Sequence, residues 1–174
     1  MYYAIILALI LILLAVWLIS TKRRLAAMEE NIGNAMNQLG VQMFSRFDAL
    51  FSLLAIARLY APHEAQTLIE AVRVRRSAIT ACSAPEDVIR QRDVIADATM
   101  CLSALTEQYP DITRDADYQK RVDAVICYGR MVRTSALIYN DSAAKLNREL
   151  HRFPTMLIAG LLGSRERAYL HLPN

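Results

Sequence analysis

Residues 122–150, VDAVICYGRMVRTSALIYNDSAAKLNREL, carry the most regular apolar pattern in the chain. Apolar and small residues recur there at alternating steps of three and four, which is the spacing of one face of an α-helix. The face comprises Val122, Val125, Gly129, Val132, Ala136, Tyr139, Ala143, Leu146 and Leu150. Such a face, kept over four heptads, predicts a long helix that packs against another one. Because several of its members are small, we expect the neighbouring helix to approach closely.

A second row with the same spacing runs from Leu25 to Ala57 and predicts another long helix. The row comprises Leu25, Met28, Ile32, Met36, Leu39, Met43, Phe47, Leu50, Leu54 and Ala57. Gly33 and Gly40 lie within it, and each weakens a helix by about 1 kcal/mol relative to alanine, which does not break it. No capping signal separates this helix from the residues before it. We therefore expect one continuous helix up to the stop at Pro62.

Two shorter helices are expected between the long ones. The first covers residues 63–81. The second is predicted to begin with Ser83 as its N-cap and Glu86 in the capping-box position, and to reach Gln108. A proline-containing stretch then breaks the chain, and the last helix is expected over residues 112–152. No strand pattern competes, so the fold class is all-α: an N-terminal transmembrane helix continues into a long-helix antiparallel four-helix bundle with an apolar C-terminal tail.

The first nineteen residues, MYYAIILALILILLAVWLI, contain no charged side chain. A helix needs about 20 apolar residues to cross the core of a bilayer. Three basic residues, Lys22, Arg23 and Arg24, follow this run and none precedes it, which is the charge order of a retained anchor rather than of a cleaved signal peptide. Basic flanks tend to stay in the cytoplasm. We therefore expect residues 1–20 to be a single anchor, with the N-terminus outside and the bundle, residues 21–152, in the cytoplasm.

Composition and motifs argue against several functional classes. The 20 basic and 17 acidic residues give a net charge of +3 and form no concentrated basic stripe, so nucleic acid is not an expected partner. Cys82, Cys101 and Cys127 are odd in number and widely spaced, which suggests neither disulfides nor a zinc site. There is no phosphate-binding loop, HExxH or serine elbow. The neighbours His63 and Glu64 point about 100° apart on a helix. We therefore expect no catalytic residue, metal or cofactor, and predict that the protein is not an enzyme.

The apolar stretch HRFPTMLIAGLLG, residues 151–163, lies near the end of the chain. The first and last helices of the bundle each rise about 60 Å and the middle two roughly 30–37 Å, so the last helix should end beside the membrane end of the first. The membrane-proximal residues of the tail, 153–174, are Phe153, Pro154, Met156, Leu157, Ile158, Leu161 and Leu162. Nine apolar residues are too few to span a bilayer. The stretch either enters the membrane interface, covers a neighbour's anchor, or folds back to close the end of the bundle.

Uncharged amide side chains form a stripe beside the apolar row of the first helix. Its members, Asn31, Asn34, Gln38 and Gln42, are spaced by three and four residues. A solvated face more often uses Glu and Lys, which solubilise a helix better. The stripe is therefore either a contact between subunits that fixes their register, or an ordinary polar face.

Basic residues gather at two places outside this stripe. Arg73, Arg75 and Arg76 cluster on the second predicted helix, with Arg58 at the end of the first. This cluster is either a solvated, ion-paired face or a docking site for an acidic partner. The other group is Lys22, Arg23 and Arg24, which are suited to anionic lipid headgroups as well as to setting topology.

Six stretches in one order along the chain resemble a known family. They are the N-terminal anchor, ENIGNAMNQLGVQMFSRFDAL (30–50), YAPHE (60–64), YPD (109–111), YN (139–140) and RFPTMLIAGLLG (152–163). Together they resemble the LemA family of bacterial membrane-anchored proteins. The resemblance implies long helices anchored by one span in the bacterial inner membrane, with no catalytic residues to carry over, and some relatives are linked to building magnetosome membranes. Phe51 and Ser52 replace a proline–asparagine pair of the family, so a kink in the first helix is expected to be absent.

These observations predict a non-enzymatic scaffold as the leading function. Such a protein would self-assemble into a high-order homo-oligomer and organise or remodel the bacterial inner membrane, with the lipid bilayer as its partner. The alternative is a membrane-localised adaptor or regulator that binds another protein, for example in envelope stress or proteolysis.

Overall fold

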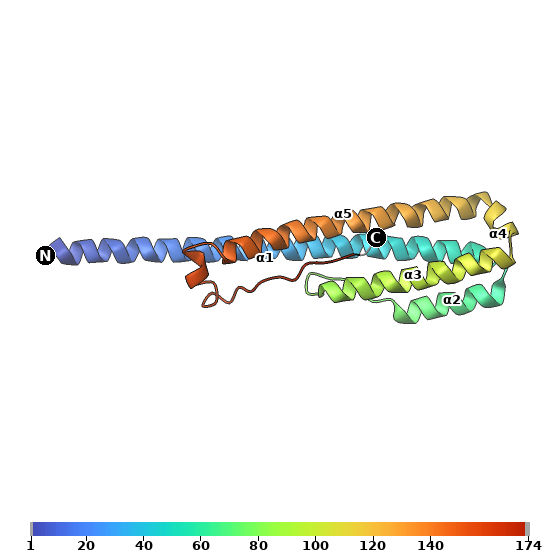
Figure 1. Ribbon diagram of the computed structural model, residues 1–174, viewed down its shortest axis with the longest axis horizontal. Coiled ribbons are helices and arrows are strands. Elements are labelled where there is room, and N and C mark those ends of the chain that lie inside the picture. Colours follow the sequence, from blue (N-terminus) through green and yellow to red (C-terminus); the bar gives the residue numbers. More distant parts are fainter. Residues whose placement is uncertain (1, 173–174) are drawn as a thin grey trace.

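The computed structural model describes residues 2–172. Along the chain lie α1 (Tyr2–Ala57), α2 (Pro62–Arg75), α3 (Pro85–Gln108), α4 (Asp111–Arg114), α5 (Ala116–Leu150) and a short 3-10 helix, η1 (Thr155–Leu157). Figure 1 shows α5 running back along α1, whereas the shorter α2 and α3 lie beside the half of α1 farthest from the N-terminus. The prediction of an all-helical chain with one long apolar N-terminal helix is confirmed.

The two apolar rows read from the sequence form the seam between α1 and α5. Every member of the α1 row is buried except the half-buried Met28. In the α5 row, only Val122 and Gly129 are half-buried, and the others are buried. Because a fully buried leucine or phenylalanine contributes about 1.5–3 kcal/mol, this seam supplies much of the stability of the core.

Helix α1 is continuous from the apolar stretch into the core, as predicted. It passes through Gly33 and Gly40 without a break, and also through Phe51 and Ser52, where no kink was expected. A rigid helix therefore links the apolar N-terminal stretch to the packed part of the molecule.

Helix α2 ends at Arg75, so the predicted helix over residues 63–81 is too long. The cause is Gln91, a buried residue of α3. Its Nε2 donates to Arg75 O at 3.1 Å, and its Oε1 accepts from Ser77 N at 2.8 Å. These two bonds occupy backbone groups that a further turn of helix would use. Residues 76–84 leave the helix as a result, and Ile79 comes against Gly40 of α1.

The start of α3 differs from the predicted capping box by one residue. Ala84 is the N-cap, and its N–H donates to Asp87 Oδ2 at 2.9 Å. Glu86 does not take this role. Ser83, predicted as the N-cap, instead accepts a bond from Thr80 N at 3.0 Å, which stabilises the preceding turn.

The predicted last helix, residues 112–152, is interrupted at Asp115. This residue is extended, and its Oδ1 accepts from Asp117 N at 2.8 Å and from Tyr118 N at 3.2 Å, so it caps α5. The Tyr118 N–H is the main cause of the lowered pKa of the Asp115 carboxyl. Tyr60 O–H donates to the other carboxylate oxygen at 3.1 Å. A strong N-cap thus ends α4 after one turn and starts α5 in a new direction.

Candidate interaction surfaces

The apolar part of α1 is long and apolar enough to cross a membrane. Its large side chains are exposed along most of the stretch. Such a row of exposed aliphatic side chains is unfavourable in water and suits a lipid environment. Of the basic residues that follow, Lys22 and Arg23 are exposed, whereas Arg24 binds Glu149 of α5 with an N–O distance of 3.0 Å. This ion pair brings the end of α5 beside α1, as the helix lengths predict.

Residues 151–163, which we call the end loop, follow α5 at this same end of the molecule (Figure 1). The loop has two faces. Its inner face comprises the buried Thr155 and Ala159 and the half-buried Ile158 and Leu162. Its outer face comprises the exposed Phe153, Pro154, Met156, Leu157 and Leu161. The predicted tail residues are therefore divided between a surface that covers the helices and a surface that does not.

Residues 164–172, which we call the strap, run back along α5 rather than staying at the end loop (Figure 1). Two asparagines of α5 hold its backbone. Asn140 donates to Leu170 O at 2.8 Å and accepts from Leu170 N at 2.7 Å. Asn147 makes the same pair of bonds with Arg167, each at 2.9 Å. Leu170 is buried, so the strap contributes to the core.

The predicted amide stripe lies in a surface groove between α1 and α5, which we call the amide groove. Two adjoining hollows of about 560 and 360 Å³ make up the groove, and they share Gln38 and Ile138. From α1 the groove receives Asn31, Asn34, Gln38 and Gln42; from α5 it receives Cys127, Met131, Thr134, Ile138, Asp141, Ser142 and Lys145, among others. Ile138 is 51% and Met131 43% exposed, so the groove joins uncharged polar groups to apolar surface.

Three of the four arginines predicted to form a docking site line one cleft. Arg58, Arg73 and Arg76 surround a cleft of about 390 Å³ with Phe51 and Ile69. The fourth does not join them. Arg75 forms an ion pair with Asp97 of α3 at 2.9 Å. Arg73 and Arg76 are also paired, with Glu70 at 3.1 Å and with Asp48 at 3.2 Å.

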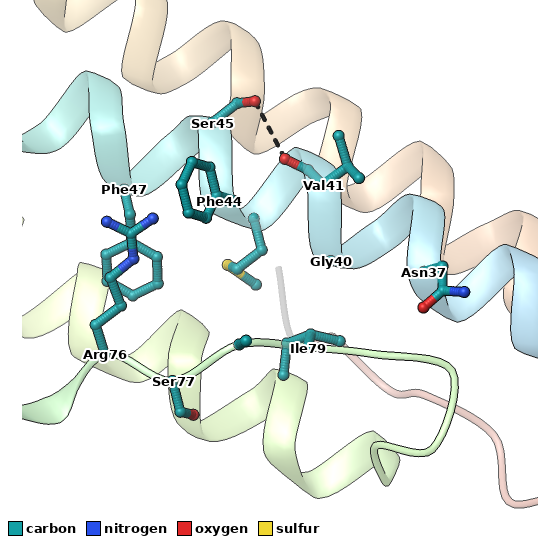
Figure 2. A pocket seen from close by; sticks show the side chains of 11 residues that line it. Asn37, Gly40, Val41, Phe44, Ser45, Phe47, Arg76, Ser77 and Ile79 are labelled. Carbon is teal, nitrogen blue, oxygen red and sulfur yellow. Dashed lines mark hydrogen bonds between the residues drawn. The ribbon is translucent and has the colours of Figure 1, made fainter.

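A second cleft, of about 540 Å³, lies beside the arginines, where residues 76–79 run alongside α1 (Figure 2). The Arg76 guanidinium carbon lies 4.1 Å from the ring centroid of Phe44 and 5.3 Å from that of Phe47. Gly40 allows this segment to approach α1 closely, since a Cβ at this position would lie 2.2 Å from Ile79 O. Sequence reasoning missed this cleft. The available signal was the spacing of Phe44, Phe47 and Phe51, but their arginine partner depends on where α2 ends.

Arg46 is a half-buried charged residue of α1 that sequence reasoning also missed. Its Nε is buried and has no hydrogen-bond partner among residues 2–172. Burial and the neighbouring Arg92 lower the pKa of its guanidinium. The side chain fits because Gly129 of α5 has no Cβ, which would lie 3.2 Å from Arg46 Cζ. Gly129 therefore leaves room for the Arg46 side chain as well as for the close approach of α1.

Comparison with known proteins assigns the chain to a family. No curated protein matches it. The model of the LemA family matches residues 35–174, which begin after the apolar stretch and extend through the packed helices to the strap. Because the match covers well over half of the 174 residues, the chain belongs to the LemA family.

Proposed function

We propose that this protein is a non-enzymatic, membrane-anchored scaffold whose copies associate through the amide groove and thereby organise the bacterial inner membrane. The observation that supports it best is the groove itself. Its four amide side chains, Asn31, Asn34, Gln38 and Gln42, line it from one helix and adjoin exposed apolar side chains of α5.

The chemistry of the groove suits contact with a second copy of the same surface. A carboxamide carries both donors and an acceptor, so it can pair with another carboxamide. A stripe of like charges would instead repel its own copy. In symmetric dimers the same patch meets itself, so self-complementary groups are what such a contact requires. Ile138 and Met131 add the apolar area that a stable contact needs.

The continuity of α1 links such a contact to the membrane. The amide stripe and the anchor belong to one helix without a break. Copies that pair through α1 would therefore hold their anchors at a fixed spacing. In this proposal the N-terminus lies outside and the packed helices lie in the cytoplasm, as the basic residues after the anchor favour.

Crosslinking in isolated membranes tests the contact. We would replace Cys82, Cys101 and Cys127 with serine, introduce Gln38→Cys in this background, and add a short bismaleimide. We expect crosslinked dimers. A matched control retains only Cys101, which is exposed on α3 outside the groove, and should stay largely monomeric. Equal dimer yields from both proteins, or none from Gln38→Cys, would rule out the groove as the contact.

One observation favours the alternative, an adaptor that binds another protein: Arg58, Arg73 and Arg76 converge on one cleft. A photoreactive residue in place of Gln66, beside that cleft, would then crosslink a foreign polypeptide in cells. The double variant Arg58→Glu/Arg73→Glu should abolish that band, whereas reversal of the exposed Arg90 should not. Persistence of the band in the double variant would exclude the cleft as a docking site.

A further inference from the structure

The end loop lies at the depth of the membrane boundary. The apolar residues 2–19 rise about 27 Å, close to the thickness of roughly 30 Å of a bilayer core, so this core ends near Ile19. The surface of α1 becomes covered at the same level. Trp17 and Leu18 are half-buried, and Thr21 and Leu25 are buried. The end of α5 and the end loop are the segments beside this part of α1 (Figure 1).

The outer face of the end loop is strongly apolar for a surface exposed at a helix end. Phe153 is 74%, Leu157 64% and Leu161 88% exposed. A loop that served only to cover the ends of the helices would need its inner face alone, which is formed by Thr155, Ile158, Ala159 and Leu162. Exposed apolar clusters of this kind mark contact surfaces rather than surfaces in water.

Charges around the end loop favour an anionic surface. Arg148, Arg152 and Arg165 are exposed near it on the chain, and Lys22 and Arg23 are exposed on α1. Two nearby carboxylates have partners within the molecule. Glu149 Oε2 lies 3.0 Å from a guanidinium nitrogen of Arg24, and Glu166 Oε1 lies 3.0 Å from His151 Nε2. Apolar side chains ringed by basic ones are typical of segments that insert into the interface of a membrane with anionic lipids.

From this arrangement we propose that the outer face of the end loop inserts into the headgroup region of the same bilayer that α1 spans. It would do so beside the anchor and on the side of the packed helices, and it would bind anionic lipid. The inference rests on the membrane-anchoring part of the proposed function but not on self-association. Two contacts with one leaflet would fix the tilt and rotation of α1, which a single span leaves variable.

Fluorescence quenching by brominated lipid tests the insertion in the full-length protein. The chain has one tryptophan, so Trp17→Phe gives a silent background for the reporter Leu161→Trp. Vesicles would contain phosphatidylcholine and phosphatidylglycerol, with bromine on the acyl carbons nearest the headgroup. The protein would be present at less than one copy per vesicle, so the result does not depend on self-association.

We expect the reporter at residue 161 to lose roughly half of its emission, because interfacial segments bury their apolar face about 5–10 Å into the headgroup boundary. Leu59→Trp in the same background is the control, since Leu59 is 78% exposed and follows the C-terminal end of α1, which is the end opposite the anchor. The unaltered protein, with Trp17 in the anchor, verifies that the chain has inserted. Adding Arg152→Glu and Arg165→Glu to the reporter should weaken its quenching.

Two results would overturn the proposal. An unquenched reporter at residue 161, in a preparation where Trp17 is quenched, would mean that the end loop stays outside the lipid. Equal quenching at residues 59 and 161 would mean that the loop has no special contact. A failed crosslink at Gln38 would leave this result unaffected, so the two proposals fail separately.

Discussion

The close approach of residues 76–80 to α1 depends on Gly40, and replacement of this glycine by alanine gives the sharpest test of the fold. The added Cβ would lie 2.2 Å from Ile79 O and 3.0 Å from Ile79 C, whereas real Cβ atoms essentially never come within 3.0 Å of another heavy atom. The obstacle is backbone, which cannot rotate away as a side chain can. Residues 76–80 must therefore shift in the Gly40→Ala variant, together with the buried side chain of Ile79.

Gly33→Ala is a matched control for Gly40→Ala. Both glycines lie in the middle of α1, seven residues apart, and alanine at either position gains about 1 kcal/mol of helix propensity. The Cβ at residue 33 would meet only Ala81 Cβ at 3.4 Å, an ordinary contact. Overpacking costs about 1–3 kcal/mol. We therefore expect Gly33→Ala to be the more stable variant by about 1–3 kcal/mol, because the propensity gain cancels in the comparison.

Denaturant unfolding in detergent micelles, followed by circular dichroism, measures this difference in the full-length protein. Gly33→Ala should equal or exceed the parent in its free energy of unfolding, and Gly40→Ala should fall below Gly33→Ala. If the two variants were equally stable, residues 76–80 would not lie against α1, and the cleft beside them would not exist in solution.

Three further variants test single contacts. Asn140→Ala removes both bonds to Leu170, each worth about 0.5–1.5 kcal/mol, so strap amides should exchange faster with deuterated water while α1 amides do not. Arg46→Met removes a half-buried charge whose Nε is buried without a hydrogen-bond partner among residues 2–172, and should leave the unfolding free energy unchanged or raise it; a clear loss would refute this. The pKa of the Asp115 carboxyl is lowered in the folded protein. Its contribution to stability is therefore present above the ordinary pKa of 3.8 and is lost as the pH falls through the lowered pKa. The melting temperature of Asp115→Asn should therefore fall less steeply with decreasing pH in the acid range than that of the parent, and an equally steep fall would refute this.

The faces of the two long helices were predictable because their signal is local. A period of 3.6 residues, kept through α1 and α5, identifies the buried side of each without knowledge of the other. The helix lengths alone predicted that the C-terminal end of α5 would lie beside the part of α1 next to the anchor. The predicted caps were less accurate, since Ala84 and Asp87 replaced Ser83 and Glu86 by a shift of one residue.

The end of α2 and the course of the strap were not predictable, because distant residues determine both. Residues up to Ala81 read as helix, and it is the side chain of Gln91 that ends α2 at Arg75. Asn140 was noted only as part of the stretch YN and Asn147 was not singled out, yet each holds the backbone of the strap. Amide side chains carry no sequence signal for a partner that lies twenty or more residues away.

The structure brings some of the predicted site residues together and separates others. The amide stripe lies in one groove because its spacing keeps it on one face of α1. Among the arginines, Arg75 separates from Arg58, Arg73 and Arg76 because neighbours at the end of a helix point in different directions. The end loop divided into two faces, which its uniformly apolar sequence did not indicate.

The central proposal is self-association through the amide groove of the membrane-anchored chain. Electron microscopy of the full-length protein, extracted with its native lipids, tests it most directly. The account predicts ordered closed particles in which the grooves of neighbouring copies face each other and the anchors lie at one surface. Single copies, or small particles that contain a second polypeptide and leave the groove uncovered, would contradict it.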